Sequence, residues 1–163
     1  MVRFKIEDFF SPEDLPNLVP SQEYAVAWVN DRTIPHNGVD VALRNAYRES
    51  LPHKPFIKVF WAEGPGVITR ASYHFTDSLH AYGNRLSISF DTQFELYIAH
   101  LEGIFPTMRV GKEVGKGELL GFMGDTGAVT GPHFHFGIRD KNTGEYWNPH
   151  NFIDFSAVIE NDG

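Results

Sequence analysis

The chain of 163 residues has no cysteine, so disulfides and thiolate metal sites are excluded, and any bound metal must be held by nitrogen and oxygen. It has no apolar run of about 18 residues or more, the length that a membrane-spanning helix needs. It also lacks a dense stretch of lysine and arginine, and its net charge is −7. Nucleic-acid binding, which normally requires a basic surface, is therefore not expected.

The length and a hydrophobic content of 42% indicate one soluble globular domain that can bury a sizeable core. The first residues, Met1 to Asp8, contain neither an apolar export segment nor a small-residue cleavage site. We therefore expect a chain without a leader, or one whose leader precedes residue 1. Prolines interrupt residues 1–22, where we expect an N-terminal extension with one short helix capped by Ser11.

From Tyr24 onward the sequence is typical of an all-β protein. Short segments rich in Val, Ile, Phe and Tyr are divided by Gly, Pro, Asn and Asp, and no long segment keeps a helical period. These segments predict an antiparallel sheet. The expected strands are Glu23–Val29, Lys58–Ala62, Gly66–Tyr73, Arg85–Phe90, Glu95–His100, Glu118–Met123 and His133–Arg139.

Four histidines and an aspartate form the pattern with the clearest chemistry. His133 and His135 are two residues apart, so an extended strand places both on one face. His36 and Asp40 share a face in the same way if their segment is extended. Two imidazoles and a carboxylate suit zinc, and three protein donors leave a tetrahedral position for water. His100 and His133 then remain for proton transfer, as in a hydrolase.

These residues stand in blocks that resemble family M23 of zinc endopeptidases, the lysostaphin-like enzymes that cut peptidoglycan cross-links. The family's His-x-Gly-x-Asp is similar to His36–Asp40, and its Tyr-x-His-Leu to Tyr97–Leu101, with one extra residue before the histidine. Its closing block, Thr-Gly-x-x-Thr-Gly-Pro-His-x-His-Phe, is present as Thr126–Phe136. Smaller matches are Tyr82-Gly83-Asn84, Val114-Gly115-Lys116-Gly117-Glu118 and Asn148-Pro149.

The resemblance implies a lysostaphin-like sheet with a duplicated hybrid motif, and a metallopeptidase domain over residues 23–163. It also implies one zinc ion per chain. The zinc ligands would be His36, Asp40 and His135. The metal-bound water would attack the scissile amide of a cross-link or stem peptide. His100 and His133 would assist, one accepting the water's proton and the other stabilising the oxyanion or protonating the leaving amine. Asn84 is a further candidate, for substrate binding.

The implied partner is bacterial peptidoglycan, and the protein would act at the cell wall. Gram-positive walls are anionic, so a net charge of −7 provides no attraction to them. We therefore expect targeting by a separate wall-binding chain or by a virion. A compact domain without wall-binding repeats favours a bacteriophage endolysin or virion-associated lysin over a secreted bacterial hydrolase. Glycine bridges, D-Ala–diaminopimelate links and D-Ala–Gly junctions all remain candidate bonds.

Two other functions compete. A non-catalytic binding, regulatory or virion structural module would keep the fold but typically lose ligand residues, and none of the five key positions is lost here. A carrier of the glucose-permease IIA type would share the hybrid motif and phosphorylate a histidine. It has no need of His36-x-Gly38-x-Asp40, and metal analysis separates it from the enzyme.

The remaining features have structural interpretations. The histidines outside the motifs are expected to be surface or structural residues, namely His53, His74, His80 and His150. The glycines of residues 111–117 lack the phosphate-loop arrangement and predict β-turns. Three phenylalanines, Phe122, Phe134 and Phe136, are expected in the core, and Trp61 and Trp147 in packing contacts. Leu43–Lys54 is read as an insertion on the rim of the cleft, where loops set specificity.

Overall fold

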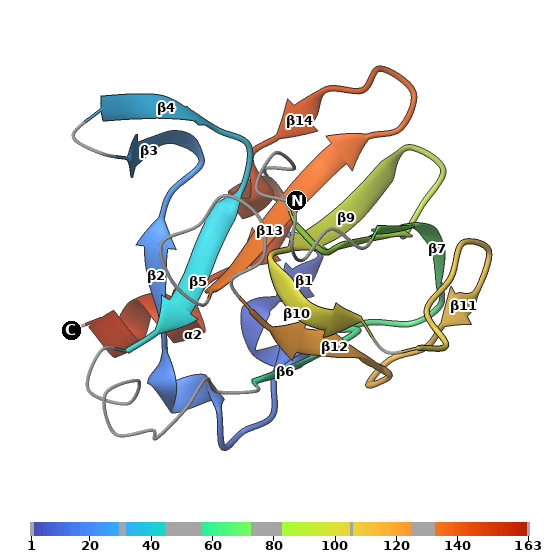
Figure 1. The fold of residues 1–163 in the computed structure, drawn as a ribbon, viewed down its shortest axis with the longest axis horizontal. Helices are drawn as coiled ribbons and strands as arrows, with labels where there is room; N and C mark the ends of the chain where they lie inside the picture. Colours follow the sequence, from blue (N-terminus) through green and yellow to red (C-terminus); the bar gives the residue numbers. More distant parts are fainter. Residues whose placement is uncertain are drawn as a thin grey trace.

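The structure is a computed structural model that describes residues 2–29, 32–44, 57–72, 83–104, 106–124 and 133–162 (Figure 1). Short β-strands dominate these ranges, and their sheets are mainly antiparallel, which confirms the all-β class. No helix in the described ranges is long and apolar enough to cross a membrane.

The largest sheet has eight strands and is called the large sheet below. Each strand in it is antiparallel to its neighbours. The order of the strands is β11 (Glu113–Val114), β7 (Gly66–Ser72), β8 (Arg85–Ser89), β9 (Phe94–Ala99), β13 (His133–Asp140), β5 (Val39–Leu43) and β2 (Leu18–Gln22), with β14 (Tyr146–Trp147) paired to β13. The small sheet joins β10 (Leu101–Ile104), β12 (Leu119–Met123) and β6 (Lys58–Phe60). A hairpin joins β3 (Ala25–Val29) and β4 (Arg32–His36).

The two ends of the chain meet beside these sheets. The strands β1 (Phe4–Lys5) and β15 (Ile153–Asp154) pair in parallel. The 3₁₀-helices are η1 (Ile6–Phe9), η2 (Leu15–Asn17), η3 (Pro149–Asn151) and η4 (Glu160–Asp162), and α2 (Ser156–Ile159) is a single α-helical turn. Figure 1 shows η1, in dark blue, beside the small sheet, and α2, in red, beneath β2.

Strand alternation gives the large sheet two different faces. One face, called the core face, carries buried apolar side chains, among them Val39, Val41, Leu86, Ile88, Leu96, Ile98, Phe134, Phe136 and Ile138. Residues directly opposite on antiparallel strands share a face, and successive residues alternate. The other face, called the polar face, therefore carries Asp40, Arg85, Ser87, Glu95, Tyr97, His135 and Arg139.

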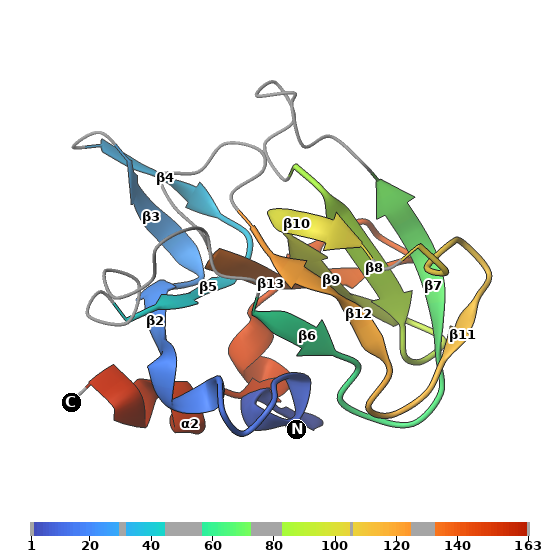
Figure 2. The ribbon, with the colours of Figure 1, turned by 60° about the horizontal axis from the view of Figure 1, so that its bottom comes forward.

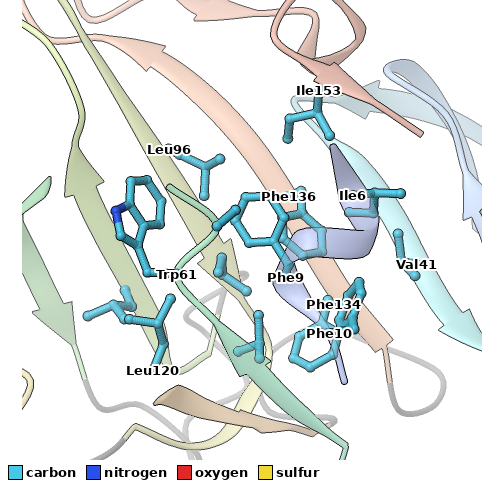
Figure 3. Packing of buried hydrophobic residues seen from close by; sticks show 14 of the residues in the cluster. Ile6, Phe9, Phe10, Val41, Trp61, Leu96, Leu120, Phe134, Phe136 and Ile153 are labelled. Carbon is cyan, nitrogen blue, oxygen red and sulfur yellow. The ribbon is translucent and has the colours of Figure 1, made fainter. Parts of the chain in front are cut away.

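The small sheet and η1 cover the core face. Figure 2 shows β10, β12 and β6 in front of β8 and β9, and Trp61 and Leu120 lie in one apolar cluster with Leu96 and Phe136 (Figure 3). From η1, Phe9 packs its ring 5.3 Å from that of Phe136, measured between centroids. Burying one such side chain stabilises the fold by about 1.5–3 kcal/mol.

All seven predicted strands are present as β3, β6, β7, β8, β9, β12 and β13, with ends that differ by at most a few residues. Four strands of the large sheet were missed, namely β2, β5 and the two-residue strands β11 and β14. Pro20 made a strand at residues 18–22 hard to predict, because proline is tolerated in a sheet mainly on an edge strand. The structure places β2 at that edge, with a register shift between Pro20 and Gln22.

The N-terminal segment has the predicted helical character, as η1 and η2. Its described residues belong to the same core as the rest, since Phe4, Ile6 and Phe9 are buried in the apolar cluster. Ser11 caps no helix, contrary to the prediction, because its hydroxyl donates to Asp14 Oδ2 in the turn before η2. The domain boundary at residue 22 stays a prediction.

Several smaller predictions can be compared with the structure. Trp61, Phe134 and Phe136 are buried as expected, but Phe122 is only half-buried, since β12 runs along the outside of the core there. Trp147 packs on Phe94 while 38% of it stays exposed. The glycine-containing segment 111–117 forms turns around β11. Most of the predicted insertion, from Asn45 on, lies outside the described residues.

Candidate metal centre

His36 and Asp40 lie on two strands rather than on one extended segment. His36 ends β4, Asp40 is in β5, and Asn37 and Gly38 form the connection. The two side chains still meet, with His36 Nε2 3.3 Å from Asp40 Oδ1. A Cβ at Gly38 would lie 2.4 Å from His135 Nε2 and 2.4 Å from the carbonyl oxygen of Phe136. Only glycine therefore lets this connection pack against β13, which explains its place in the His-x-Gly-x-Asp motif.

The central strand β13 brings the other two histidines to the same place. His135 lies directly opposite Asp40 on β5, and its Nδ1 is 2.9 Å from Asp40 Oδ1. His133, two residues earlier, shares this face as predicted, with Nε2 3.5 Å from Asp40 Oδ2. Within the described ranges, His36, Asp40 and His135 offer three ligand atoms that all lie within 4.8 Å of one another.

Contacts on the far side of each ring fix which nitrogen faces Asp40. His36 Nδ1 is 2.7 Å from the backbone carbonyl oxygen of Glu23, which can only accept a hydrogen bond. His135 Nε2 is 3.1 Å from the hydroxyl of Tyr97. A metal-ligating histidine characteristically donates its other N–H to such an oxygen. His36 Nε2 and His135 Nδ1 are thus left facing the carboxylate.

The carboxylate itself points to a bound cation. Asp40 Oδ1 is buried and has no hydrogen bond of ordinary geometry within the part of the chain that the structure describes. Two imidazole nitrogens nevertheless lie 2.9 Å and 3.3 Å from it. A buried carboxylate oxygen is costly unless a proton or a metal compensates its charge. The donor set of two nitrogens and one oxygen fits zinc.

The electrostatics of Asp40 and His135 agree with this assignment. Burial by itself would raise the pKa of Asp40, but the imidazoles of His135 and His36 outweigh it and hold the pKa well below its usual range. Burial lowers the pKa of His135, with Asp40 opposing it only in part. Burial also acts to lower the pKa of His36, yet the contact with Asp40 wins and raises it. An ionised carboxylate and a neutral His135 are the forms that bind a metal.

His100 reaches the site through an unusual backbone conformation. It lies between β9 and β10 with φ +62°, and no other described residue except glycine has a positive φ. Its ring centroid is 4.7 Å from that of His133 and 5.9 Å from that of His135. Tyr97 and His100 are three residues apart, so a regular strand would direct them to opposite faces. The left-handed residue breaks the strand and directs the imidazole to the polar face.

Asn84 is buried and holds the start of β10, the strand that follows His100. Its Nδ2 donates to the carbonyl oxygens of Leu101 at 3.0 Å and Glu102 at 3.4 Å, while the Leu101 N–H donates to the Asn84 carbonyl at 3.2 Å. These contacts connect Asn84 to the backbone that directly follows His100. Its predicted contact with substrate stays a prediction.

Sequence reasoning did not identify the residues that support the ligands. Glu23 supplies a backbone carbonyl, which no side-chain motif reveals, and Tyr97 was noted only as part of a motif. His150 was expected to be structural, and its Nε2 lies 2.7 Å from Glu23 Oε2. Several predicted features lie outside the described residues, namely His53, His74, His80 and the Thr126–Pro132 part of the closing block.

The fold and the donor set define a class, an antiparallel β-sheet protein with a candidate metal centre of two histidines and one aspartate. The family description "Peptidase family M23" matches residues 35–149. The chain belongs to peptidase family M23, and its lysostaphin-like sheet is the fold predicted from the sequence.

Individual proteins show the same likeness. The peptidoglycan DD-endopeptidase ShyA of Vibrio cholerae is 30% identical over 108 residues, which cover 66% of this chain and 21% of ShyA. The catalytic domain of the prophage-encoded M23 protein EnpA from Enterococcus faecalis has TM-score 0.61 and 22% identity, covering 87% and 92% of the two chains. A zinc-containing peptidase from Vibrio cholerae has TM-score 0.59 and 22% identity, covering 88% and 39%. The chain thus spans about a fifth of the curated relative ShyA.

Proposed function

We propose that this protein is a zinc-dependent endopeptidase that hydrolyses cross-links or stem peptides of bacterial peptidoglycan. The observation that carries the proposal is the convergence of His36 Nε2, His135 Nδ1 and the buried Asp40 Oδ1. The name of ShyA supports peptidoglycan as the substrate, and the Vibrio cholerae peptidase supports zinc as the metal.

The three donors would hold one zinc ion and leave one position for water. Bound zinc supplies Lewis-acid chemistry and lowers the pKa of its water from about 15.7 to about 7. His100 and His133 lie beside the donors with ring centroids 4.7 Å apart. Each imidazole can accept or donate a proton, so one serves as the base for the attacking water. The other stabilises the oxyanion or protonates the leaving amine.

The non-catalytic alternative has less support. A module that only binds or regulates needs neither an ordered donor set nor two further histidines beside it. The site instead has a left-handed residue at His100, a backbone cost that a purely structural role does not require. We also propose action at the cell wall, with targeting by a separate chain or virion. A phage lysin stays the proposal made from the sequence.

The test combines metal analysis with digestion of cell walls. We expect about one zinc per chain, loss of activity on chelation and recovery when zinc is added back. Purified sacculi of differing cross-bridge chemistry are digested, and the new amino termini identify the bond that is cut. A protein that binds zinc but releases no amino termini from any sacculus supports the non-catalytic module. A protein that binds no zinc contradicts the proposal.

A further inference from the structure

Tyr97 touches both segments that carry histidine ligands. Its side chain is fully buried, at 0% exposure. The hydroxyl lies 3.1 Å from Nε2 of His135 and donates to the backbone carbonyl oxygen of Asn37 at 3.0 Å. Asn37 directly follows His36. One hydroxyl therefore connects the β13 ligand to the turn that follows the β4 ligand.

The direction of these hydrogen bonds follows from their partners. A carbonyl oxygen only accepts, so the single hydroxyl hydrogen of Tyr97 is used on Asn37. The hydroxyl oxygen must then accept from His135, which places the hydrogen of the neutral imidazole on Nε2. His135 Nδ1 is left with its lone pair, directed toward Asp40 and the metal position.

The ring of Tyr97 is held from three sides. It is nearly parallel to the His135 ring, with an interplanar angle of 24° and centroids 5.4 Å apart. Arg85 places its guanidinium carbon 4.0 Å from the centroid of the ring. Gly137 lies directly opposite on β13, where a Cβ would be 2.0 Å from Tyr97 Cζ. The ring has room only because residue 137 is glycine.

We propose that Tyr97 is a positioning residue of the metal centre, whose hydroxyl selects the metal-binding tautomer of His135 and ties β13 to the β4–β5 turn. The inference rests on the proposed metal site and adds a residue that sets the affinity of this site for zinc. Such supporting partners typically change metal affinity by about 10–100-fold. The same loss is expected when the hydroxyl of Tyr97 is removed.

The experiment compares Tyr97→Phe with wild type, using zinc alone in competition with a chromophoric chelator. Tyr97→Phe keeps the ring and removes one oxygen, and we expect zinc affinity to fall by about 10–100-fold. The absorption spectrum of the cobalt-substituted protein should also change, because the His135 ring is no longer fixed. Thr69→Val is the matched control. Its hydroxyl donates to Glu95 Oε2 at 2.6 Å on the same face, away from the ligands, so wild-type affinity is expected.

Gly137→Ala is a second test of the role of Tyr97, since the added methyl group displaces the Tyr97 ring without removing an atom that faces the metal position. It should weaken zinc binding as Tyr97→Phe does. Wild-type zinc affinity and an unchanged cobalt spectrum in Tyr97→Phe overturn the inference, even if the melting temperature falls. A wild-type protein that binds no zinc overturns the proposed function instead, so the two failures are distinguishable.

Discussion

The two faces of the large sheet are built from the same strands and both carry buried side chains, yet they differ in chemistry. On the core face, Leu96 and Phe136 pack among apolar side chains under the small sheet. On the polar face, Tyr97 and His135 hydrogen-bond to each other. They are the sequence neighbours of Leu96 and Phe136. Glu95, also on the polar face, is only 6% exposed and pairs with Arg139 at 3.1 Å.

Within a single strand, alternate residues therefore serve stability on one face and the candidate site on the other. Burial on the core face is non-directional, so the core tolerates changes of shape at a modest cost. Buried polar groups require directed partners, and each lost partner costs about 1–3 kcal/mol. The polar face therefore specifies positions, and the core face mainly supplies stability. The predictions below change one face at a time.

The largest effect is expected on the polar face, from removal of a ligand. Each of the variants His36→Ala, Asp40→Ala and His135→Ala deletes one of the three proposed donors, so zinc and hydrolytic activity should be lost together. Metal content by elemental analysis and release of amino termini from sacculi provide the measurements. Wild-type zinc occupancy in all three variants would show that the ligands are misassigned.

The next effect concerns His100 and His133, the two histidines that are proposed to assist the reaction without holding the metal. His133→Ala and His100→Asn should keep zinc but lose turnover by about 10²–10⁴-fold, with substrate affinity changed less. Asparagine suits position 100 because it tolerates the left-handed backbone there. If both imidazoles act in one step, the double variant should be scarcely slower than either single variant. Zinc loss in His133→Ala or full activity in His100→Asn contradicts this division of roles.

The sequence singles out these five positions because their chemistry is carried by side chains in blocks of fixed spacing, and the structure brings the five side chains together, while their roles stay predictions. It predicted β13 correctly, since alternating His and Phe residues show which face each one takes. It did not predict that His36 and Asp40 lie on separate strands, because a two-residue connection leaves no pattern of its own. The Glu23 carbonyl and the left-handed His100 were also missed. Both are properties of the backbone, set by long-range packing.

On the core face, the comparison predicts loss of stability without loss of the site. Leu96→Ala should lower the free energy of unfolding by about 2–5 kcal/mol, because it leaves a cavity beneath Trp61 and Phe136. Its neighbour Tyr97 should keep its place, so zinc affinity per folded molecule should stay at the wild-type value. Denaturant unfolding of the metal-free protein and zinc titration measure the two quantities. A fall in zinc affinity as large as that expected for Tyr97→Phe would show that the two faces are coupled.

The smallest effect is expected at Asn84, where a substitution should lower both stability and turnover. Asn84→Ala leaves the carbonyls of Leu101 and Glu102 without their amide donor, which should cost about 1–3 kcal/mol of stability. Because these carbonyls directly follow His100, turnover should fall while zinc content stays that of wild type. Asn84→Leu is the informative partner, since it keeps about the size of the side chain and adds no charge but removes the NH₂ donor, and turnover should fall as in Asn84→Ala. If Asn84 instead contacts substrate, the loss will appear as a raised KM with kcat unchanged. Turnover and KM on a soluble cross-linked muropeptide distinguish the two roles, because support of the left-handed backbone acts through His100 and therefore on kcat.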